Sequence, residues 1–140
     1  MRKSIFYVTI LVLAILVLSL AACSNTPAGP TEVQVKLNEY SIVMDQTSIP
    51  AGPVSFVIEN VGTEDHEVVL EPAGAEDAPF EMDGTESEAE DIHAGDKTTF
   101  EWTLDQPGEY QLACYIINEG DTESHAEKGM ITTFTVTAAQ

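Results

Sequence analysis

Apolar and polar residues alternate along most of the chain after residue 32, which is the pattern of β-strands that bury one face. Turn residues such as Pro, Gly and Asn separate the alternating segments, and no long segment has the period of a helix. The pattern predicts strands at 33–37, 40–44, 54–60, 66–70, 99–104, 109–114 and 130–137. We therefore predict an all-β fold, a Greek-key antiparallel β-sandwich of about seven to eight strands.

One segment, residues 71–91, interrupts this alternation. It is rich in Ala, Gly, Pro and acidic residues, and its only large apolar side chains are Phe80 and Met82. We predict a long acidic surface loop with a short helix from Ser87 to Asp91. The spacing of the carboxylates matches no EF-hand loop, so calcium binding is not predicted.

The first 22 residues have the features of an export signal. Arg2 and Lys3 precede an apolar run at 5–18, which is short for a membrane span, and small residues follow it. The sequence Leu20-Ala21-Ala22-Cys23 resembles the lipobox of bacterial lipoproteins. We therefore expect cleavage before Cys23 and lipidation of its thiol, with an ordinary cleaved signal peptide as the alternative.

The domain organisation follows from these segments. Residues 1–22 are predicted to be the lipoprotein signal peptide, and residues 23–32, which are small, polar and rich in Pro, a flexible tether. Residues 33–140 then form one domain of ordinary size. The predicted location is the cell membrane, with the domain held by its lipid on the extracytoplasmic face.

The net charge limits the possible partners. All 24 acidic residues follow Thr31, and only three of the five basic residues do, so the chain beyond the export signal has a formal charge of −21. This charge repels nucleic acid and anionic surfaces, which argues against a nucleic-acid partner. It attracts a cationic protein partner. Solubility or a saline habitat is the alternative explanation for most of the charge.

Four side chains predict a metal site. Cys114, the single thiol left if Cys23 is lipidated, ends a strand on its apolar face, and His125 and Met130 follow it. His66 starts another strand. Two imidazoles, one thiolate and a weak axial thioether are the ligands that electron-transfer copper favours, whereas thioether is a poor zinc ligand.

Each of these residues also has an ordinary explanation. Cys114 and Met130 fit core positions, and His66 and His125 fit loop positions that bind nothing. The order and spacing of all four together favour a metal site. His93, in a charged turn, is expected to be a surface residue.

The sequence resembles the cupredoxin family, which includes plastocyanin and azurin. The resemblance covers nearly all of the domain and is carried by three motifs: Asn60-x-Gly62-x-x-x-His66, Pro107-Gly108-x-Tyr110-x-x-x-Cys114 and His125-x-x-x-Gly129-Met130. It implies a cupredoxin-like sandwich with one type 1-like copper ion. The implied equatorial ligands are His66, Cys114 and His125, and the implied long axial ligand is Met130.

The same resemblance implies two further roles. Tyr110 is expected to be a tyrosine corner that bonds to the backbone across a strand connection. His125 is expected to be the more exposed imidazole and the route for electrons.

Two features depart from the family pattern. Ten residues separate Cys114 from His125, which is more than plastocyanin-like and azurin-like members have, so the loop constrains its ligands less. Glu67 follows His66 where many members carry Asn. Glu67 is therefore a candidate metal-tuning residue, or a fourth ligand of a tetragonal, non-blue site.

The function expected from the sequence is that of a membrane-anchored, extracellular carrier of single electrons. Its expected partners are redox or copper-exchange proteins with a cationic docking face. One alternative is a protein that stores copper or delivers it to a cuproenzyme such as a respiratory oxidase, and another is a metal-free binding module. No enzyme is predicted. A Cys–His nucleophile pair needs an orienting group and an oxyanion hole, and the sequence indicates neither.

Overall fold

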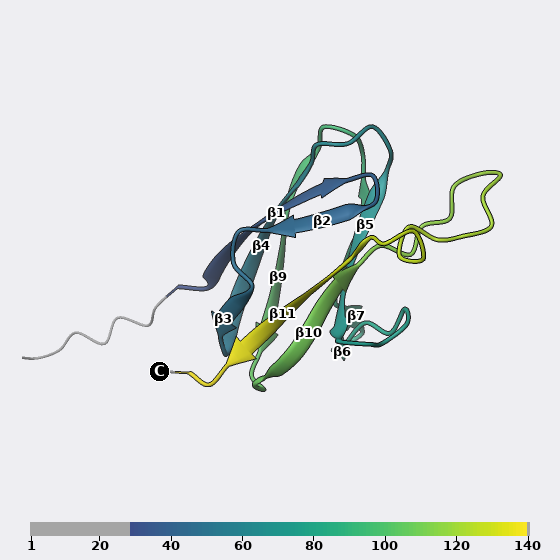
Figure 1. Cartoon of the computed structure of the whole chain (residues 1–140). Helices are drawn as coiled ribbons and strands as arrows, with labels where there is room; N and C mark the ends of the chain where they lie inside the picture. Colours follow the sequence, from purple (N-terminus) through teal and green to yellow (C-terminus); the bar gives the residue numbers. More distant parts are fainter. Residues whose placement is uncertain (1–28, 140) are drawn as a thin grey trace, which may run out of the picture.

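The computed structural model describes residues 29–139 (Figure 1). The predicted signal peptide at 1–22 and the lipidation site Cys23 lie outside these residues. From residue 29 to residue 139, no helix combines the length and the apolar character that crossing a membrane requires.

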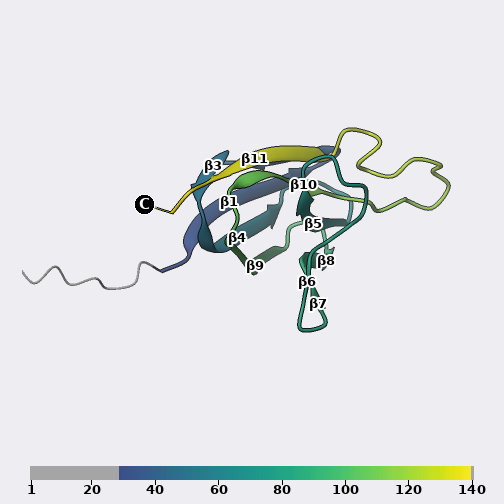
Figure 2. The ribbon, with the colours of Figure 1, turned by 90° about the horizontal axis from the view of Figure 1, so that it is seen from below.

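In the described part of the chain, eleven strands form two packed sheets and one small hairpin. The first sheet contains, in spatial order, β2 (Ser41–Met44), β1 (Thr31–Asn38), β4 (Gly52–Asn60) and β9 (Lys97–Leu104). The second contains, in spatial order, β3 (Ser48–Pro50), β11 (Ile131–Thr137), β10 (Gly108–Ala113), β5 (His66–Pro72) and β8 (Glu88–Ile92). The hairpin consists of β6 (Glu81–Met82) and β7 (Thr85–Glu86), and Figure 2 shows it projecting from the body.

The predicted all-β sandwich is confirmed, but its sheets are mixed rather than wholly antiparallel. Strand β1 runs parallel to β4, and β3 runs parallel to β11. The other pairs are antiparallel. Strand direction could not be inferred from the sequence, because alternation looks the same in either direction.

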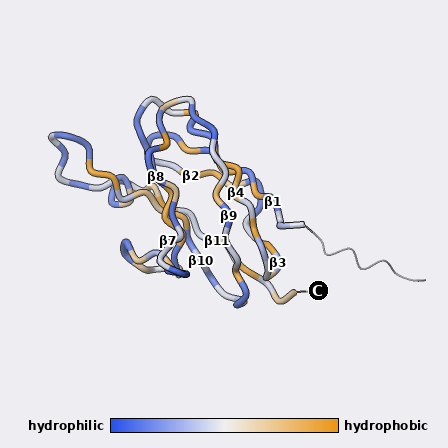
Figure 3. The backbone as a smooth tube through the Cα atoms, turned by 180° about the vertical axis from the view of Figure 1, so that it is seen from behind, coloured by the Kyte–Doolittle hydropathy of each residue, from blue (hydrophilic) through white to orange (hydrophobic). Residues whose placement is uncertain are grey.

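The alternating apolar residues form the core as predicted. Val33, Val35 and Leu37 of β1 are buried while the residues between them are exposed. Phe56 joins the two sheets, because its ring stacks on Phe100 at 5.9 Å and meets Phe134 edge-on at 6.0 Å. In Figure 3 orange apolar stretches alternate with polar ones along the strands, and the connecting loops are mostly polar.

The segment 71–91 differs from the prediction. The predicted helix from Ser87 to Asp91 is wrong, because these residues lie in or beside strand β8, which pairs with β5. Ser87 fixes this edge, since its hydroxyl donates to the Leu70 carbonyl and accepts from the Phe80 amide. Glu71 is fully buried rather than solvated, and its carboxylate accepts hydrogen bonds from Gln111 and Tyr115.

We predict that Phe56→Ala destabilises the domain by about 3–5 kcal/mol, because it removes the ring that connects the two sheets and leaves a cavity. Val43→Ala is the control, because Val43 is 59% exposed, and we expect a change within about 0.5 kcal/mol. Urea unfolding of both variants measures the two effects. A Phe56→Ala protein as stable as the control would contradict this view of the core.

Candidate metal centre

Three neighbouring strands of the second sheet bring the predicted ligands to one end of the sandwich. Strand β10 lies between β5 and β11, and its last residue, Ala113, pairs with Val69 on one side and with Ile131 on the other. Cys114 follows Ala113, His66 begins β5 and Met130 precedes β11. The long connection from β10 to β11, which carries His125, leaves the body at this same end (Figure 1).

The ligand atoms converge in a buried space. The two imidazole Nδ1 atoms of His66 and His125 are 3.2 Å apart. Cys114 Sγ lies 3.4 Å from Nδ1 of His125 and 4.0 Å from Nδ1 of His66. All three side chains are 0% exposed, and their ligand atoms lie within 4.8 Å of one another.

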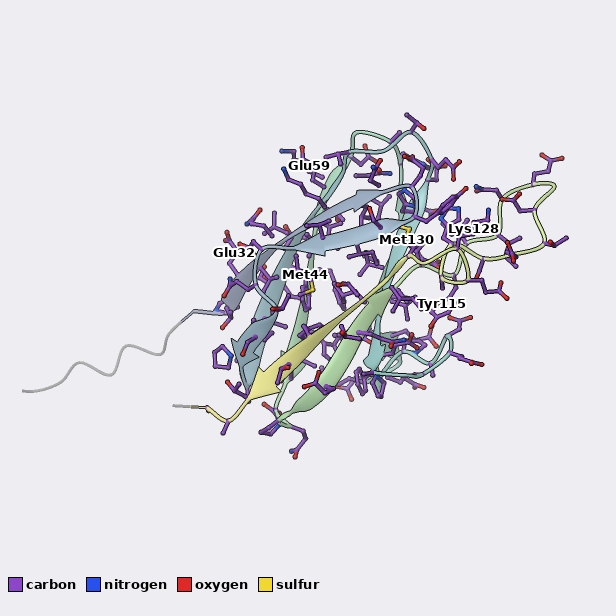
Figure 4. The ribbon with its side chains drawn as sticks, viewed as in Figure 1. Glu32, Met44, Glu59, Tyr115, Lys128 and Met130 are labelled. Carbon is purple, nitrogen blue, oxygen red and sulfur yellow. The ribbon has the colours of Figure 1, made fainter. Side chains whose placement is uncertain are left out.

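Met130 is tied to the same centre through its backbone. Its carbonyl accepts from the Cys114 amide at 3.2 Å, and its amide donates to the His125 carbonyl at 2.9 Å. The side chain is fully buried, and Figure 4 shows it at the end of the sandwich where the ligand loop begins. The structure thus brings all four predicted residues together.

A compact turn at 124–129 holds His125 and Met130 at a fixed spacing. Ser124 and Glu127 form a capping box, since the Ser124 amide donates to the Glu127 carboxylate and the Glu127 amide donates to the Ser124 hydroxyl. Gly129 ends the turn at a φ of 109°, where a side chain would be strained. The His125 amide also donates to the Ile116 carbonyl. The ten-residue loop is therefore well constrained where it carries its ligand.

A second turn, between β4 and β5, positions His66. The Asn60 side-chain amide donates to the carbonyls of Glu64 and Ile92, and its oxygen accepts from the Gly62 amide. The Glu39 carboxylate accepts from the amides of Thr63 and Glu64. A Cβ on Gly62 would collide with this carboxylate, which explains the glycine at that position.

Burial sets the charge state of the ligands. It lowers the pKa of His66, which the neighbouring His125 lowers further, and it also lowers the pKa of His125. Both imidazoles are therefore neutral at neutral pH, the form in which they bind metals. Burial raises the pKa of the Cys114 thiol, so metal binding at this site releases the thiol proton.

The residues present fit one copper ion. Two imidazole nitrogens and a sulfur converge, and the buried Met130 is joined to Cys114 and His125 through its backbone, so the residues offer the mixed donor set that suits both oxidation states of copper. Within residues 29–139, no second group of three His, Cys, Asp or Glu side chains comes close enough to hold an ion.

Glu67 is not part of the converging group. The Glu67 carboxylate instead accepts a hydrogen bond at 2.8 Å from the amide of Tyr115, the residue directly after Cys114. Burial raises the pKa of Glu67. It thereby connects the segment that carries His66 to the segment that carries Cys114. The alternative in which Glu67 serves as a fourth ligand has no support in this geometry.

The expectation that His125 is the more exposed imidazole is wrong, because both rings are 0% exposed. Tyr40 covers His125 edge-on at 5.0 Å, and the Glu64 carboxylate lies 3.4 Å from its Nε2. Sequence reasoning missed both residues, since neither belongs to the ligand motifs. His93 is a surface residue as expected, paired with Asp65 at 3.1 Å.

Comparison with known proteins identifies the family of this chain. The family model of the cupredoxin-like domain matches residues 9–132. The chain belongs to the cupredoxin family. Tyr110 forms the tyrosine corner that this resemblance implied, because its hydroxyl donates to the Gln106 carbonyl at 2.7 Å. A search of curated proteins finds no match.

Several solved structures share the fold of this cupredoxin. Dithionite-reduced auracyanin from Roseiflexus castenholzii superposes with a TM-score of 0.60 at 18% identity, over 79% of this chain and 99% of that one. Auracyanin B gives 0.61 at 20% identity, over 79% and 91%. A multicopper oxidase gives 0.51 at 15% identity, over 76% of this chain and 42% of that one.

We predict that the turn before His66 loses stability in acid through Glu39. Backbone hydrogen bonds, that of Thr63 foremost, lower the pKa of Glu39 from 4.5 to about 2. A carboxylate with a lowered pKa stabilises the folded state fully above its unfolded pKa and loses this effect as the pH falls to its folded pKa. The stability difference between wild type and Glu39→Gln should therefore shrink between pH 4.5 and 2.

Thermal unfolding across this pH range measures the difference. Glu32→Gln is the matched control, because it removes a carboxylate that accepts a hydrogen bond only from the Gln34 side chain on the same strand among the described residues. A difference between wild type and Glu39→Gln that stays constant with pH would contradict the prediction.

Proposed function

We propose that this cupredoxin carries single electrons through one type 1-like copper ion held by His66, Cys114, His125 and Met130. The observation that supports the proposal most directly is the convergence of two Nδ1 atoms and one Sγ within 4.8 Å in a buried space. When bound, copper supplies a one-electron couple between Cu(II) and Cu(I).

The surrounding residues favour electron transfer over chemistry that needs open ligand positions. The ligands come from strand ends and from two hydrogen-bonded turns, so their positions change little when the charge of the site changes. A thiol that is 0% exposed is also protected from oxidants and from disulfide exchange. Electron transfer benefits from both properties.

Copper delivery is the less favoured alternative. Ion transfer to a partner requires that ligands of the partner reach the metal, yet all four ligand side chains are 0% exposed. Electron transfer needs no such access, because electrons cross a thin layer of protein. The same proposal makes this chain a carrier rather than an enzyme.

The natural partner is proposed to be a cationic redox protein. A groove of about 340 Å³ lies beside Tyr115, the residue covalently next to Cys114. Glu76, Asp77 and Glu127 line this groove, and no basic residue does. A positively charged surface that docked here would come within one residue of a copper ligand.

We further propose that the protein works at the membrane surface. The sequence Leu20-Ala21-Ala22-Cys23 supports lipidation of Cys23, and residues 24–30 would then connect the lipid to β1. The lipid would hold the domain on the extracytoplasmic face, where membrane-bound redox partners are within reach.

Copper loading tests the proposed function. We expect the purified protein in detergent to bind one copper ion and to develop an intense visible band from thiolate-to-copper charge transfer. Cys114→Ser should abolish the band, and His125→Ala should abolish or strongly shift it, because each variant loses an equatorial ligand. His93→Ala is the matched control, because it removes an exposed histidine and should leave the spectrum unchanged. Wild-type protein without the band, or a band that survives in Cys114→Ser, would refute the proposal.

Association kinetics test the proposed partner. Raising the ionic strength from 0.01 to 0.15 M shortens the Debye length from about 30 to about 8 Å. We therefore expect the rate constant for electron transfer to a basic haem protein to fall about tenfold or more. Glu76→Gln combined with Asp77→Asn should lower the low-salt rate, because both line the groove without holding the ligand turn, and Glu32→Gln should change it much less. Equal effects of the two sets of substitutions would contradict docking at the groove.

A further inference from the structure

The outer nitrogen of His125 faces a carboxylate. Oε2 of Glu64 lies 3.4 Å from Nε2 of His125 and accepts a hydrogen bond from the Asn118 side chain at 2.8 Å. Among the described residues, Nε2 of His125 has no hydrogen-bond partner, although it is fully buried. Nε2 of His125 therefore faces the Glu64 carboxylate at 3.4 Å, but the geometry is not that of a hydrogen bond.

The position of Glu64 is fixed from several sides. Its amide donates to the Glu39 carboxylate at 2.9 Å, and its carbonyl accepts from the Asn60 side chain at 2.8 Å. Asn118, in the middle of the long ligand loop, holds the carboxylate itself. The side chain is only 35% exposed. Its placement beside His125 thus results from the turn that positions His66 and from the loop that carries His125.

The tautomer of His125 follows from the geometry of the site. Nδ1 points into the cluster, 3.4 Å from Cys114 Sγ, so Nδ1 is the nitrogen that is free to donate a lone pair to a metal. With a metal on Nδ1, the ring proton resides on Nε2, facing Glu64. A carboxylate that accepts this proton increases the basicity of the imidazole and fixes the ring orientation.

We propose that Glu64 is a positioning residue that lowers the reduction potential of the copper site by accepting the Nε2 proton of His125. This inference rests on the proposed copper-binding function. A negative charge at the outer nitrogen stabilises the more positive oxidation state, Cu(II), more than Cu(I). The carboxylate also covers the face of His125 through which a partner would otherwise reach the ring.

One other charged side chain lies close enough to oppose this effect. Lys128 sits over the Tyr40 ring, 4.7 Å from its centroid, and Tyr40 packs against His125. Its ammonium is paired with the Asp121 carboxylate, which neutralises most of its field at the site. Glu64 therefore remains as a charge 3.4 Å from Nε2 that no described basic side chain pairs with.

The test is Glu64→Gln in the copper-loaded protein. Glutamine keeps the size of the side chain and an oxygen for Asn118 but removes the charge. We expect the affinity for Cu(II) relative to Cu(I) to fall about tenfold, which corresponds to a rise of about 59 mV in the potential of a one-electron couple. Asn118→Ala should shift the potential in the same direction by a smaller amount, because it frees the carboxylate without removing it.

Glu32→Gln is the matched control for the change in net charge. Glu32 lies on β1, and Figure 4 shows it well away from Met130 and Lys128. Voltammetry of the four proteins gives the potentials, and circular dichroism verifies that each is folded. A potential of Glu64→Gln equal to that of Glu32→Gln, with the thiolate-to-copper band intact, would overturn the proposal.

A second readout separates this proposal from the proposed function. If the wild-type protein shows no thiolate-to-copper band, copper binding fails, and the contact is then examined in metal-free protein by histidine side-chain NMR. A Glu64→Gln change in the Nε2 resonance of His125 that is absent in Glu32→Gln would support the positioning contact. Unchanged resonances would overturn it.

Discussion

The metal centre depends on the register of strand β10 between β5 and β11. Because Ala113 pairs with both Val69 and Ile131, the residue after it must emerge between the segments that carry His66 and Met130. A shift of one residue in either pairing would turn the thiol of Cys114 to the opposite face of the sheet. The hydrogen-bonded ladder of the second sheet therefore fixes the centre before any side chain of the loops contributes.

The loops at this end then adjust the ligands through polar contacts with the backbone. Asn60 and Glu39 hold the turn before His66, and Glu67 holds the amide that follows Cys114. Each contact satisfies partly buried backbone groups in the segments that lead to or follow a ligand. A ligand set assembled in this way keeps its shape with little help from the metal.

The sequence predicted the sandwich and the ligand set because both leave local patterns. Alternation identified most of the core, and the order of His66, Cys114, His125 and Met130 identified the centre. Sequence analysis failed where contacts between residues far apart in the chain determine which side chains are buried. The burial of Glu71 depends on partners forty residues or more away, such as Gln111, and the burial of His125 depends on Tyr40 and Glu64. Strand β8 also escaped prediction, because an edge strand rich in acid has no apolar alternation.

The capping box at Ser124 and Glu127 separates the two halves of the ligand loop. His125 and Met130 belong to a turn that closes on its own hydrogen bonds. Residues 119–123 lie outside this turn, and among them Asp121 pairs with Lys128 and donates its amide to the Asn118 carbonyl. Insertions or deletions in that outer half leave the spacing of the two ligands intact. The outer half of the loop can thus change its length without rebuilding the centre beneath it.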